Sequence, residues 1–215
     1  MAVNTVKVME SIYSANDLIA SEIQRRLLDK GIYTVNVIGA PGAGKTSCLI
    51  GIIGGLAGVK CYVIEGDIQS DIDTEKLKGL GIDAVQIQTG GACHLEGALI
   101  RDTLGKFPLV GPGVLFIENI GNLVCPAEFN IGENIKVLIV TVAEGADKPY
   151  KYPLAFEKAA AILLNKSDLM PYVAFDMDYF TKGVRALNAD APIFLVSAKS
   201  GDGLHEVCRW LKTRL

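Results

Sequence analysis

The sequence predicts an α/β fold, with a mostly parallel central sheet and helices on both of its faces. Two observations predict it. Short apolar runs rich in β-branched residues recur along the chain with little alternation, and helical patterns lie between several of them. Strands that are covered on both faces read as continuous apolar runs, and alternating strands and helices are typical of parallel sheets.

Seven strands are expected, at residues 33–38, 61–65, 84–88, 114–118, 135–142, 160–164 and 193–196. Helices are expected at residues 45–56, 74–80, 95–104, 175–187 and 203–215. An amphipathic helix at about 16–30 precedes the first strand, with Asn16 positioned to cap its start and Gly31 to end it. Ligands of such sheets bind at the carboxyl ends of the strands, so the residues after each strand are the candidates for function.

Length and composition narrow the class of protein. The 215 residues fit one domain, residues 1–215, which can bury a core without a metal or disulfide. Hydrophobic residues make up 50% and charged residues 21%, which excludes a disordered chain, and the net charge of −3 argues against nucleic acid as the main partner. No run reaches the roughly 18 apolar residues of a membrane span and no secretory signal is recognisable, so we expect a cytoplasmic protein without membrane attachment.

A phosphate-binding loop follows the first expected strand. Residues 39–46 read GAPGAGKT, which fits the pattern G-x-x-x-x-G-K-S/T between a strand and a helix, as in P-loop nucleotide hydrolases. The glycines allow backbone amides to surround phosphate oxygens, Lys45 reaches the β- and γ-phosphates, and the Thr46 hydroxyl is a ligand for Mg²⁺. The nucleotide-binding residues expected in this loop are Gly39, Gly42, Ala43, Gly44, Lys45, Thr46 and Ser47.

Two further segments predict that the base is guanine. Residues 165–168 read NKSD at the end of the sixth strand, and residues 197–199 read SAK at the end of the seventh. A carboxylate at Asp168 can accept from the N1–H and the exocyclic amine of guanine, a pair of donors that adenine lacks. Asn165 is expected to tie the base to the phosphate loop. The expected base-binding residues are Asn165, Lys166, Asp168, Ser197, Ala198 and Lys199.

Acidic residues follow the second and fourth strands, where Mg²⁺ would complete the nucleotide site. Mg²⁺ prefers oxygen ligands, and Asp67, Asp71 and Glu118 are the candidates, although the two aspartates also suit the start of a helix. Gly121 offers an amide to the γ-phosphate, which would let its loop respond to hydrolysis. We therefore predict a GTPase in which Lys45, Glu118 and Gly121 support water attack on the γ-phosphoryl group. Slow turnover is expected, because no arginine can be assigned to stabilise the transition state.

Two cysteines and a histidine form a separate candidate site. Cys93 and His94 are adjacent after the third strand, and Cys125 follows the fourth. Both segments lie on the nucleotide side of the sheet, so two thiolates and an imidazole can converge into a donor set that suits Zn²⁺ or Ni²⁺. The residue types also permit buried structural cysteines and a capping histidine. The remaining ones are interpreted as core cysteines and a surface histidine: Cys48, Cys61, Cys208 and His205.

Seven segments of the chain, taken in order, are GAPGAGKT, EGD, TGGACHLEG, FIENIGNLVCPAEF, TVAEGADKPYKYP, LLNKSDLMPY and SAKSGDGL. Together they resemble the HypB family, the GTPases that assist nickel insertion during maturation of nickel–iron hydrogenases. The resemblance runs from about residue 33 to the C-terminus and implies the signal-recognition and MinD-like (SIMIBI) class of P-loop fold. It also implies GTP-dependent homodimerisation, Cys93, His94 and Cys125 as ligands of nickel or zinc, and a nickel-insertion co-chaperone and a hydrogenase large subunit as partners.

The chain is thus interpreted as a GTP-hydrolysing metallochaperone whose metal binding and dimerisation depend on nucleotide state. The first 30 residues contain no cysteine or histidine, so no N-terminal nickel-storage site is expected. Three alternatives stay open. The first is a urease accessory GTPase, which would carry a contiguous Cys-Pro-His. The second is a small-molecule kinase, which would not need the guanine-binding motif at residues 165–168. The third is a regulatory GTP-binding module, which would have no metal function.

Overall fold

A seven-stranded sheet forms the centre of the computed structural model, which describes residues 8–67, 72–107 and 109–215, with side chains from residue 15 onward. The strands are β1 (Ile32–Gly39), β2 (Cys61–Asp67), β3 (Asp83–Gln88), β4 (Gly113–Glu118), β5 (Ile135–Thr141), β6 (Ala161–Asn165) and β7 (Ile193–Leu195). Their order is β3-β2-β4-β1-β5-β6-β7, and every neighbouring pair is parallel. The expected α/β class and all seven expected strands are confirmed.

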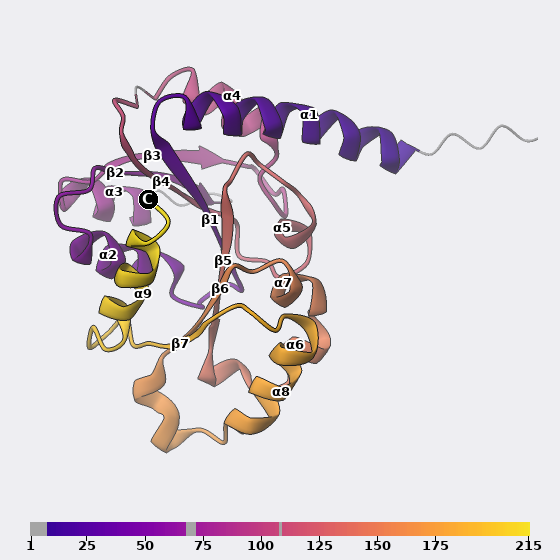
Figure 1. The fold of residues 1–215 in the computed structure, drawn as a ribbon, viewed down its shortest axis with the longest axis vertical. Helices are drawn as coiled ribbons and strands as arrows, with labels where there is room; N and C mark the ends of the chain where they lie inside the picture. The colour runs from indigo at the N-terminus through magenta and orange to yellow at the C-terminus, as the bar shows by residue number, and fades with distance from the viewer. Residues whose placement is uncertain (1–7, 68–71, 108) are drawn as a thin grey trace, which may run out of the picture.

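Two layers of helices cover the sheet (Figure 1). One face carries α2 (Lys45–Gly55), α3 (Ile72–Gly79) and α9 (Leu204–Lys212). The other carries α1 (Val8–Leu28), α4 (Gly97–Leu104), α5 (Cys125–Glu128), α7 (Pro153–Glu157) and α8 (Met177–Leu187), with α6 (Lys148–Lys151) against α7 and α8. Two 3₁₀ helices, η1 (Val142–Glu144) and η2 (Ser167–Tyr172), follow β5 and β6. Among the described residues, no helix has the length and apolar character needed to cross a membrane.

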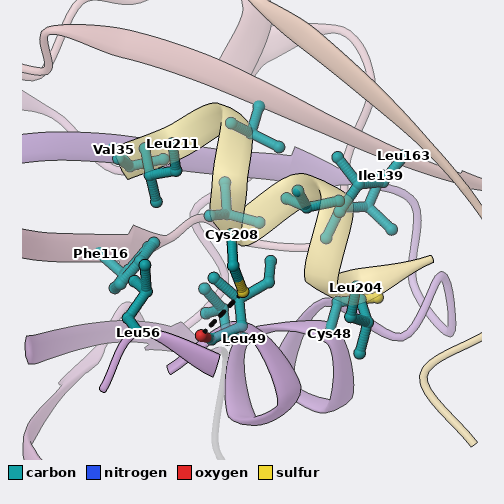
Figure 2. Close-up of a cluster of buried hydrophobic side chains, with 14 of the residues drawn as sticks. Val35, Cys48, Leu49, Leu56, Phe116, Ile139, Leu163, Leu204, Cys208 and Leu211 are labelled. Carbon is teal, nitrogen blue, oxygen red and sulfur yellow. Dashed lines mark hydrogen bonds between the residues drawn. The ribbon is translucent and has the colours of Figure 1, made fainter. Parts of the chain in front are cut away.

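Packing on both faces explains why the strands read as continuous apolar runs. Val35 and Phe116 pack beneath α2 and α9, whereas Ile32 and Leu115 pack beneath α1 and α4. Figure 2 shows the first of these clusters, where side chains of α2 and α9 meet those of the sheet. As expected, His205 is exposed on α9. The three cysteines interpreted as core residues are buried in the first cluster: Cys48, Cys61 and Cys208.

Three short helices are missing from the elements that the sequence predicts. α5, α6 and α7 are four or five residues long, and each has a proline in its first turn. A helix of about one turn shows no hydrophobic periodicity, so its pattern cannot be distinguished from a loop. The longer helices after β1 are found within three residues of their expected ends.

The N-terminal helix departs furthest from expectation. α1 begins at Val8, so Asn16 lies inside it and does not cap it. The Asn16 side chain instead joins two other elements. Its Oδ1 accepts from the amide of Gly97 at the start of α4 (2.9 Å), and its Nδ2 donates to the carbonyl of Asn130 (2.7 Å). Asn16 therefore does act as a capping residue, as its type suggests, but the helix that it caps is α4 and not its own helix. Gly31, which was expected to end this helix, lies three residues beyond its last residue, Leu28, and with φ of 68° it turns the chain into β1.

We predict that Asn16→Ala lowers the free energy of unfolding by about 2 kcal/mol, because a buried amide and a carbonyl lose their partners. The matched control is Ser21→Ala on the same helix, whose hydroxyl donates only to the carbonyl of Asp17 one turn earlier. It should change the free energy of unfolding by less than about 0.5 kcal/mol. Urea unfolding measures both values, and equal losses in the two variants would contradict the bridging role of Asn16.

Candidate functional site

A cleft of about 440 Å³ lies at the carboxyl ends of β1, β2 and β4. In the sheet β1 lies between β4 and β5, where the strand order reverses, and open α/β sheets bind ligands at such points. The phosphate loop and the residues after β2 and β4 line the cleft together. The lining residues are Pro41, Gly42, Gly44, Lys45, Thr46, Ser47, Glu65, Gly66, Asp67, Asp73, Glu118, Asn119, Ile120 and Gly121.

Two glycines allow the loop to lie close to its neighbours. Gly44 precedes α2 with φ of 86°, and a Cβ atom there would lie 2.5 Å from Asn165 Nδ2. A Cβ atom on Gly121 would lie 2.9 Å from Pro41 of the loop. Lys45 at the start of α2 is buried, and the first residues of this helix line the cleft. A helix N-terminus favours phosphate groups.

A hydroxyl and a carboxylate form the centre of the cleft. Thr46 Oγ1 donates to Glu118 Oε1 at 3.0 Å, while Glu118 Oε2 is buried without a hydrogen-bond partner among the described residues. Burial raises the pKa of Glu118 to about 7, although Lys45 and the Thr46 hydroxyl act in the opposite direction. A buried carboxylate with an unused oxygen, beside a threonine hydroxyl, is a suitable ligand pair for Mg²⁺.

The structure adds a buried acid that the sequence analysis missed. Glu65 lies two residues before Asp67 on β2 and accepts from Thr74 Oγ1 at 3.1 Å, and burial raises its pKa to about 7. Side chains two residues apart on a strand point to the same face, so placing Asp67 in the cleft implied the same place for Glu65. Asp73 also lines the cleft. Asp71, the other expected Mg²⁺ ligand, lies outside the described residues.

A second cavity of about 300 Å³ adjoins the cleft and shares Gly44 and Ser47 with it. The phosphate loop, residues 165–168 and residues 197–199 meet there, as the sequence predicts. Lys166 has φ of 59°, a left-handed backbone conformation that non-glycine residues adopt where the surrounding structure imposes it. The remaining lining residues are Asn165, Lys166, Asp168, Leu169, Ala198 and Lys199.

Hydrogen bonds hold the polar groups of this second cavity in place. Asn165 Nδ2 donates to the carbonyl of Ala43 in the phosphate loop (2.9 Å), and Asn165 Oδ1 accepts from the amide of Ala198 (3.0 Å). The buried Ser197 hydroxyl donates to Asp168 Oδ1 at 2.7 Å and so orients the carboxylate. The expected contact between Asn165 and the phosphate loop is therefore present, and the Ala198 amide is used to hold Asn165.

The cysteine and histidine side chains also meet. The side-chain atoms of Cys93, His94 and Cys125 that could hold a metal ion lie within 4.8 Å of one another. Cys93 Sγ is 3.2 Å from Cys125 Sγ and 3.4 Å from His94 Nδ1. Burial lowers the pKa of His94, which favours the neutral imidazole that binds metals. The ring lies against Phe129, tilted by 30°, with centroids 3.9 Å apart. The hydrogen bond with Cys93 raises the pKa of Cys125. We call these three residues the thiol–imidazole cluster.

Residues 119–124, here called the switch segment, connect this cluster with the phosphate loop. The amide of Asn122 donates to the carbonyl of Gly39 at 3.1 Å. Asn122 Nδ2 donates to the carbonyl of Cys93 (3.2 Å), and its Oδ1 accepts from the amide of Val124 (2.9 Å). One asparagine therefore touches the loop that would bind phosphate and the two segments that carry the cysteines. Sequence reasoning missed Asn122, because its partners are distant in the chain.

Known proteins resemble this chain in sequence and in fold. The profile described as "CobW/HypB/UreG, nucleotide-binding domain" matches residues 33–195. The "Hydrogenase maturation factor HypB" of Escherichia coli strain K12 is 40% identical over 210 residues, which cover 97% of this chain and 72% of that protein. The crystal structure of HypB from Helicobacter pylori in complex with nickel has a TM-score of 0.88 at 36% identity, covering 93% of this chain and 94% of that one.

A more distant likeness concerns the fold alone. The signal recognition particle receptor FtsY from Elizabethkingia anophelis in complex with GDP has a TM-score of 0.52 at 16% identity, covering 85% of this chain and 65% of that one. This likeness agrees with the P-loop fold that the sequence predicts.

Burial of Glu118 predicts a pH-dependent loss of stability in the protein without nucleotide or divalent cations. Its pKa of about 7 in the folded state exceeds the ordinary 4.5, so the folded state binds the additional proton between these values. The free energy of unfolding therefore falls as the pH rises from 4.5 to about 7. Above this range the contribution of Glu118 to stability is at its lowest. At pH 8 in EDTA, we predict that Glu118→Gln raises the free energy of unfolding by about 2–3 kcal/mol.

At pH 4.5 the same substitution should change the free energy of unfolding by less than about 0.5 kcal/mol, because the folded-state carboxyl is then protonated. Glu22→Gln replaces an exposed carboxylate on α1 and is the control, with less than about 0.5 kcal/mol expected at both pH values. Urea unfolding at the two pH values measures these differences. A gain from Glu118→Gln that is equal at pH 4.5 and pH 8 would contradict the effect of burial.

Proposed function

The chain belongs to the HypB family of CobW/HypB/UreG nucleotide-binding domains, and from this premise we propose that it is a GTP-hydrolysing nickel chaperone for hydrogenase maturation. One relative is a hydrogenase maturation factor, and a related HypB structure is a complex with nickel. The observation that carries the proposal is the thiol–imidazole cluster, whose three metal-binding atoms lie within 4.8 Å of one another and which Asn122 joins to the phosphate loop.

Guanine recognition is assigned to Asp168. Ser197 holds one of its carboxylate oxygens, and the side chain lines the cavity beside the phosphate loop. The carboxylate accepts from guanine N1–H and from the exocyclic amine. Adenine would leave this acceptor without matching donors, so the site discriminates against adenine nucleotides.

Hydrolysis is assigned to the larger cleft. Lys45 and the amides of residues 39–46 hold the β- and γ-phosphates, and the Gly121 amide faces the γ-phosphate. Water attacks the γ-phosphorus, the bond from phosphorus to the β–γ bridging oxygen breaks, and GDP and phosphate are released. The described residues that line the cleft include no arginine, in keeping with slow intrinsic turnover.

The residues present suit a Mg²⁺ ion that accompanies the nucleotide. Thr46 and Glu118 would hold it together with Asp67, and the unpartnered Glu118 Oε2 supports this assignment. When bound, Mg²⁺ neutralises charge that develops on the phosphate oxygens.

Nickel is proposed as cargo of the thiol–imidazole cluster. Two thiolates supply soft sulfur donors and the imidazole supplies a nitrogen donor, a set that suits nickel and also accommodates zinc. Cys93 is exposed and Cys125 is half-buried, which suits an ion that must enter and leave. A fourth ligand can come from water or from a second copy of the chain.

We further infer that GTP promotes homodimerisation around this cluster and that the ion is passed to a nickel-insertion co-chaperone and a hydrogenase large subunit. Val124, beside Cys125, is an apolar residue that is half exposed, and a dimer formed at the cluster would cover it. Hydrolysis would move the switch segment and thereby change nickel affinity. The adjacent Cys93–His94 pair and the distant Cys125 favour this function over a urease accessory GTPase with contiguous Cys-Pro-His.

We predict that Asp168→Asn weakens GTP binding by about 100-fold or more, since an amide cannot accept from both guanine donors. Xanthosine triphosphate, which carries a carbonyl in place of the exocyclic amine, should bind the variant better than the wild type. Competition against a fluorescent guanine nucleotide measures both affinities. Asp190→Asn, at an exposed position after α8, is the control and should leave both unchanged; unaltered GTP affinity in the Asp168 variant would refute the assignment.

We predict that nickel affinity and dimerisation differ between the GDP state and the state with a non-hydrolysable GTP analogue, by about fivefold or more in affinity. Cys93→Ala should weaken nickel binding by more than about tenfold, because a metal ligand is lost. Cys61→Ala is the matched control, since Cys61 is buried in the core. Competition with a chromophoric chelator and sedimentation measure these quantities. Equal affinity and equal dimerisation in the two states would contradict the proposed function.

A further inference from the structure

We propose that Asn119 is the positioning residue that couples the nucleotide cleft to the thiol–imidazole cluster, through one side-chain oxygen that holds both the switch segment and the segment carrying His94. The inference rests on the proposed function, because it concerns how nucleotide state changes nickel binding. It assigns that coupling to a residue outside the thiol–imidazole cluster whose side chain is hydrogen bonded to neighbouring segments of the chain.

One atom makes both connections. Asn119 Oδ1 accepts from the amide of Ile120 at 3.0 Å and from the amide of Leu95 at 3.1 Å. Ile120 and Gly121 line the phosphate cleft, and Leu95 directly follows His94. Asn119 is 1% exposed, so water does not substitute for these bonds. The wall of the nucleotide cleft and the segment that carries the imidazole therefore share one buried acceptor.

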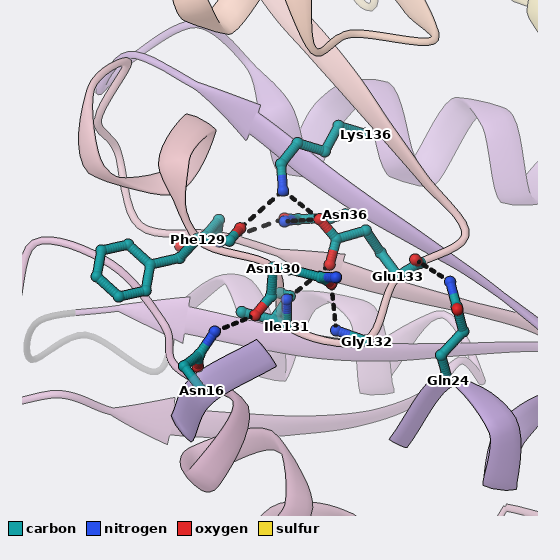
Figure 3. Close-up of polar contacts among 10 residues, drawn as sticks. Asn16, Gln24, Asn36, Phe129, Asn130, Ile131, Gly132, Glu133 and Lys136 are labelled. Atoms are coloured by element: carbon teal, nitrogen blue, oxygen red, sulfur yellow. Dashed lines mark hydrogen bonds and ion pairs between the residues drawn. The ribbon is translucent and has the colours of Figure 1, made fainter. Parts of the chain in front are cut away.

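Contacts outside the site set the direction of the Asn119 carboxamide. Asn119 Nδ2 donates to Asn36 Oδ1 on β1, and Asn36 Nδ2 donates to Glu133 Oε1, each at 3.3 Å. Glu133 pairs with Lys136, whose Nζ also donates to the carbonyl of Phe129 at 2.7 Å (Figure 3). A carboxylate only accepts, so Asn36 presents its amino group to Glu133 and its oxygen to Asn119. Asn119 must then turn its own oxygen toward the two amides.

Consecutive residues at the end of β4 serve the two sites. Glu118 accepts from Thr46 at the start of α2, whereas Asn119 contacts Asn36 and Leu95 in the opposite layer, because side chains of a strand alternate. A movement of the switch segment toward the γ-phosphate displaces Ile120. The shared oxygen then either carries Leu95 with it or releases one of the two amides. Both results change the position of His94 relative to Cys125, which lies in the segment after the switch.

Asparagine meets a requirement here that other residues of its size do not. The position needs an acceptor for two amides and a donor to Asn36 in one buried, uncharged group. Aspartate has no donor and would add a buried charge, and leucine supplies neither function. Asn122 makes a second connection from the switch segment to the segment that carries His94, through the carbonyl of Cys93, but Asn122 is only half-buried whereas Asn119 is fully buried.

The experiment is a nickel titration of the whole chain with Mg²⁺ and either GDP or a non-hydrolysable GTP analogue, followed by the absorption of the nickel–thiolate bond. The measured quantity is the ratio of the two nickel dissociation constants. In the wild type we expect the two nickel dissociation constants to differ by about fivefold or more. In Asn119→Ala we expect them to differ by less than about twofold. Because Asn119 lines the cleft, both titrations are run at saturating nucleotide, so that a change in nucleotide affinity does not enter the ratio.

Two further variants separate positioning from stability. Asn36→Ala leaves both amide bonds of Asn119 in place but frees its carboxamide to rotate, so the ratio should fall to an intermediate value. It also tests the inference if Asn119→Ala does not fold. Asn134→Ala removes an acceptor for the Thr34 amide (2.7 Å) at the other end of β1 and is the matched control. It should lower stability and keep the wild-type ratio.

The outcomes distinguish the inference from the proposed function. If Asn119→Ala keeps the wild-type ratio, the role of Asn119 is overturned while the proposed function stands. If Asn119→Ala does not fold, a wild-type ratio in Asn36→Ala has the same consequence. If the ratio in Asn134→Ala falls as far as it does in Asn119→Ala, the role of Asn119 is also overturned, because loss of stability alone would then explain the effect. A ratio near one in the wild type would contradict nucleotide coupling itself, and the role of Asn119 with it.

Discussion

The parallel pairing of β4 with β1 is the constraint on which both sites depend. Its register sets Val37 opposite Glu118, so β4 ends beside the start of the phosphate loop. Glu118 then reaches Thr46 on one face, and Asn119 reaches the other layer. A slip of one residue would exchange these faces and turn the carboxylate away from the cleft. The apolar side chains on both faces of these central strands oppose such a slip, so core packing secures the chemistry at the sheet edge.

The buried carboxylates of the cleft lower the stability of the protein without ligand and favour the binding of a cation. Glu65 and Glu118 are both buried, and in both cases loss of water contact raises the pKa to about 7. The nearby Lys45 offsets this only in part. Negative charge held close together in low dielectric is unfavourable without a cation, and a bound divalent ion relieves it. Binding of a nucleotide with its cation is therefore expected to stabilise the fold as well as to fill the site.

The two ligand regions differ in how firmly they are held. In the base cavity, Asn165 and Ser197 are buried and each is hydrogen bonded to a neighbouring segment, which favours one fixed geometry for recognition. The thiol–imidazole cluster takes its members from two separate connections between strands, and Cys93 is exposed. Loops on a rigid scaffold can change their relative position at lower cost than core elements. A firmly held base cavity beside a more exposed cluster is the arrangement that the proposed nucleotide-dependent chaperone would require.

The sequence by itself determined the features whose signals are local. The strands, the longer helices, the phosphate loop and residues 165–168 were each predicted from a few neighbouring residues, through hydrophobic periodicity or a short motif. The sequence also predicts that the phosphate loop meets residues 165–168 and 197–199, and that the two cysteines can converge with His94. Only the tertiary structure decided several other contacts between groups that are distant in the chain. Asn16 caps α4 rather than its own helix, Glu65 joins Glu118, and Asn119 meets Asn36 and the segment after His94. These contacts follow from the order β2-β4-β1 and its register, which arise from packing of the whole sheet and have no signal within a few residues of any one strand.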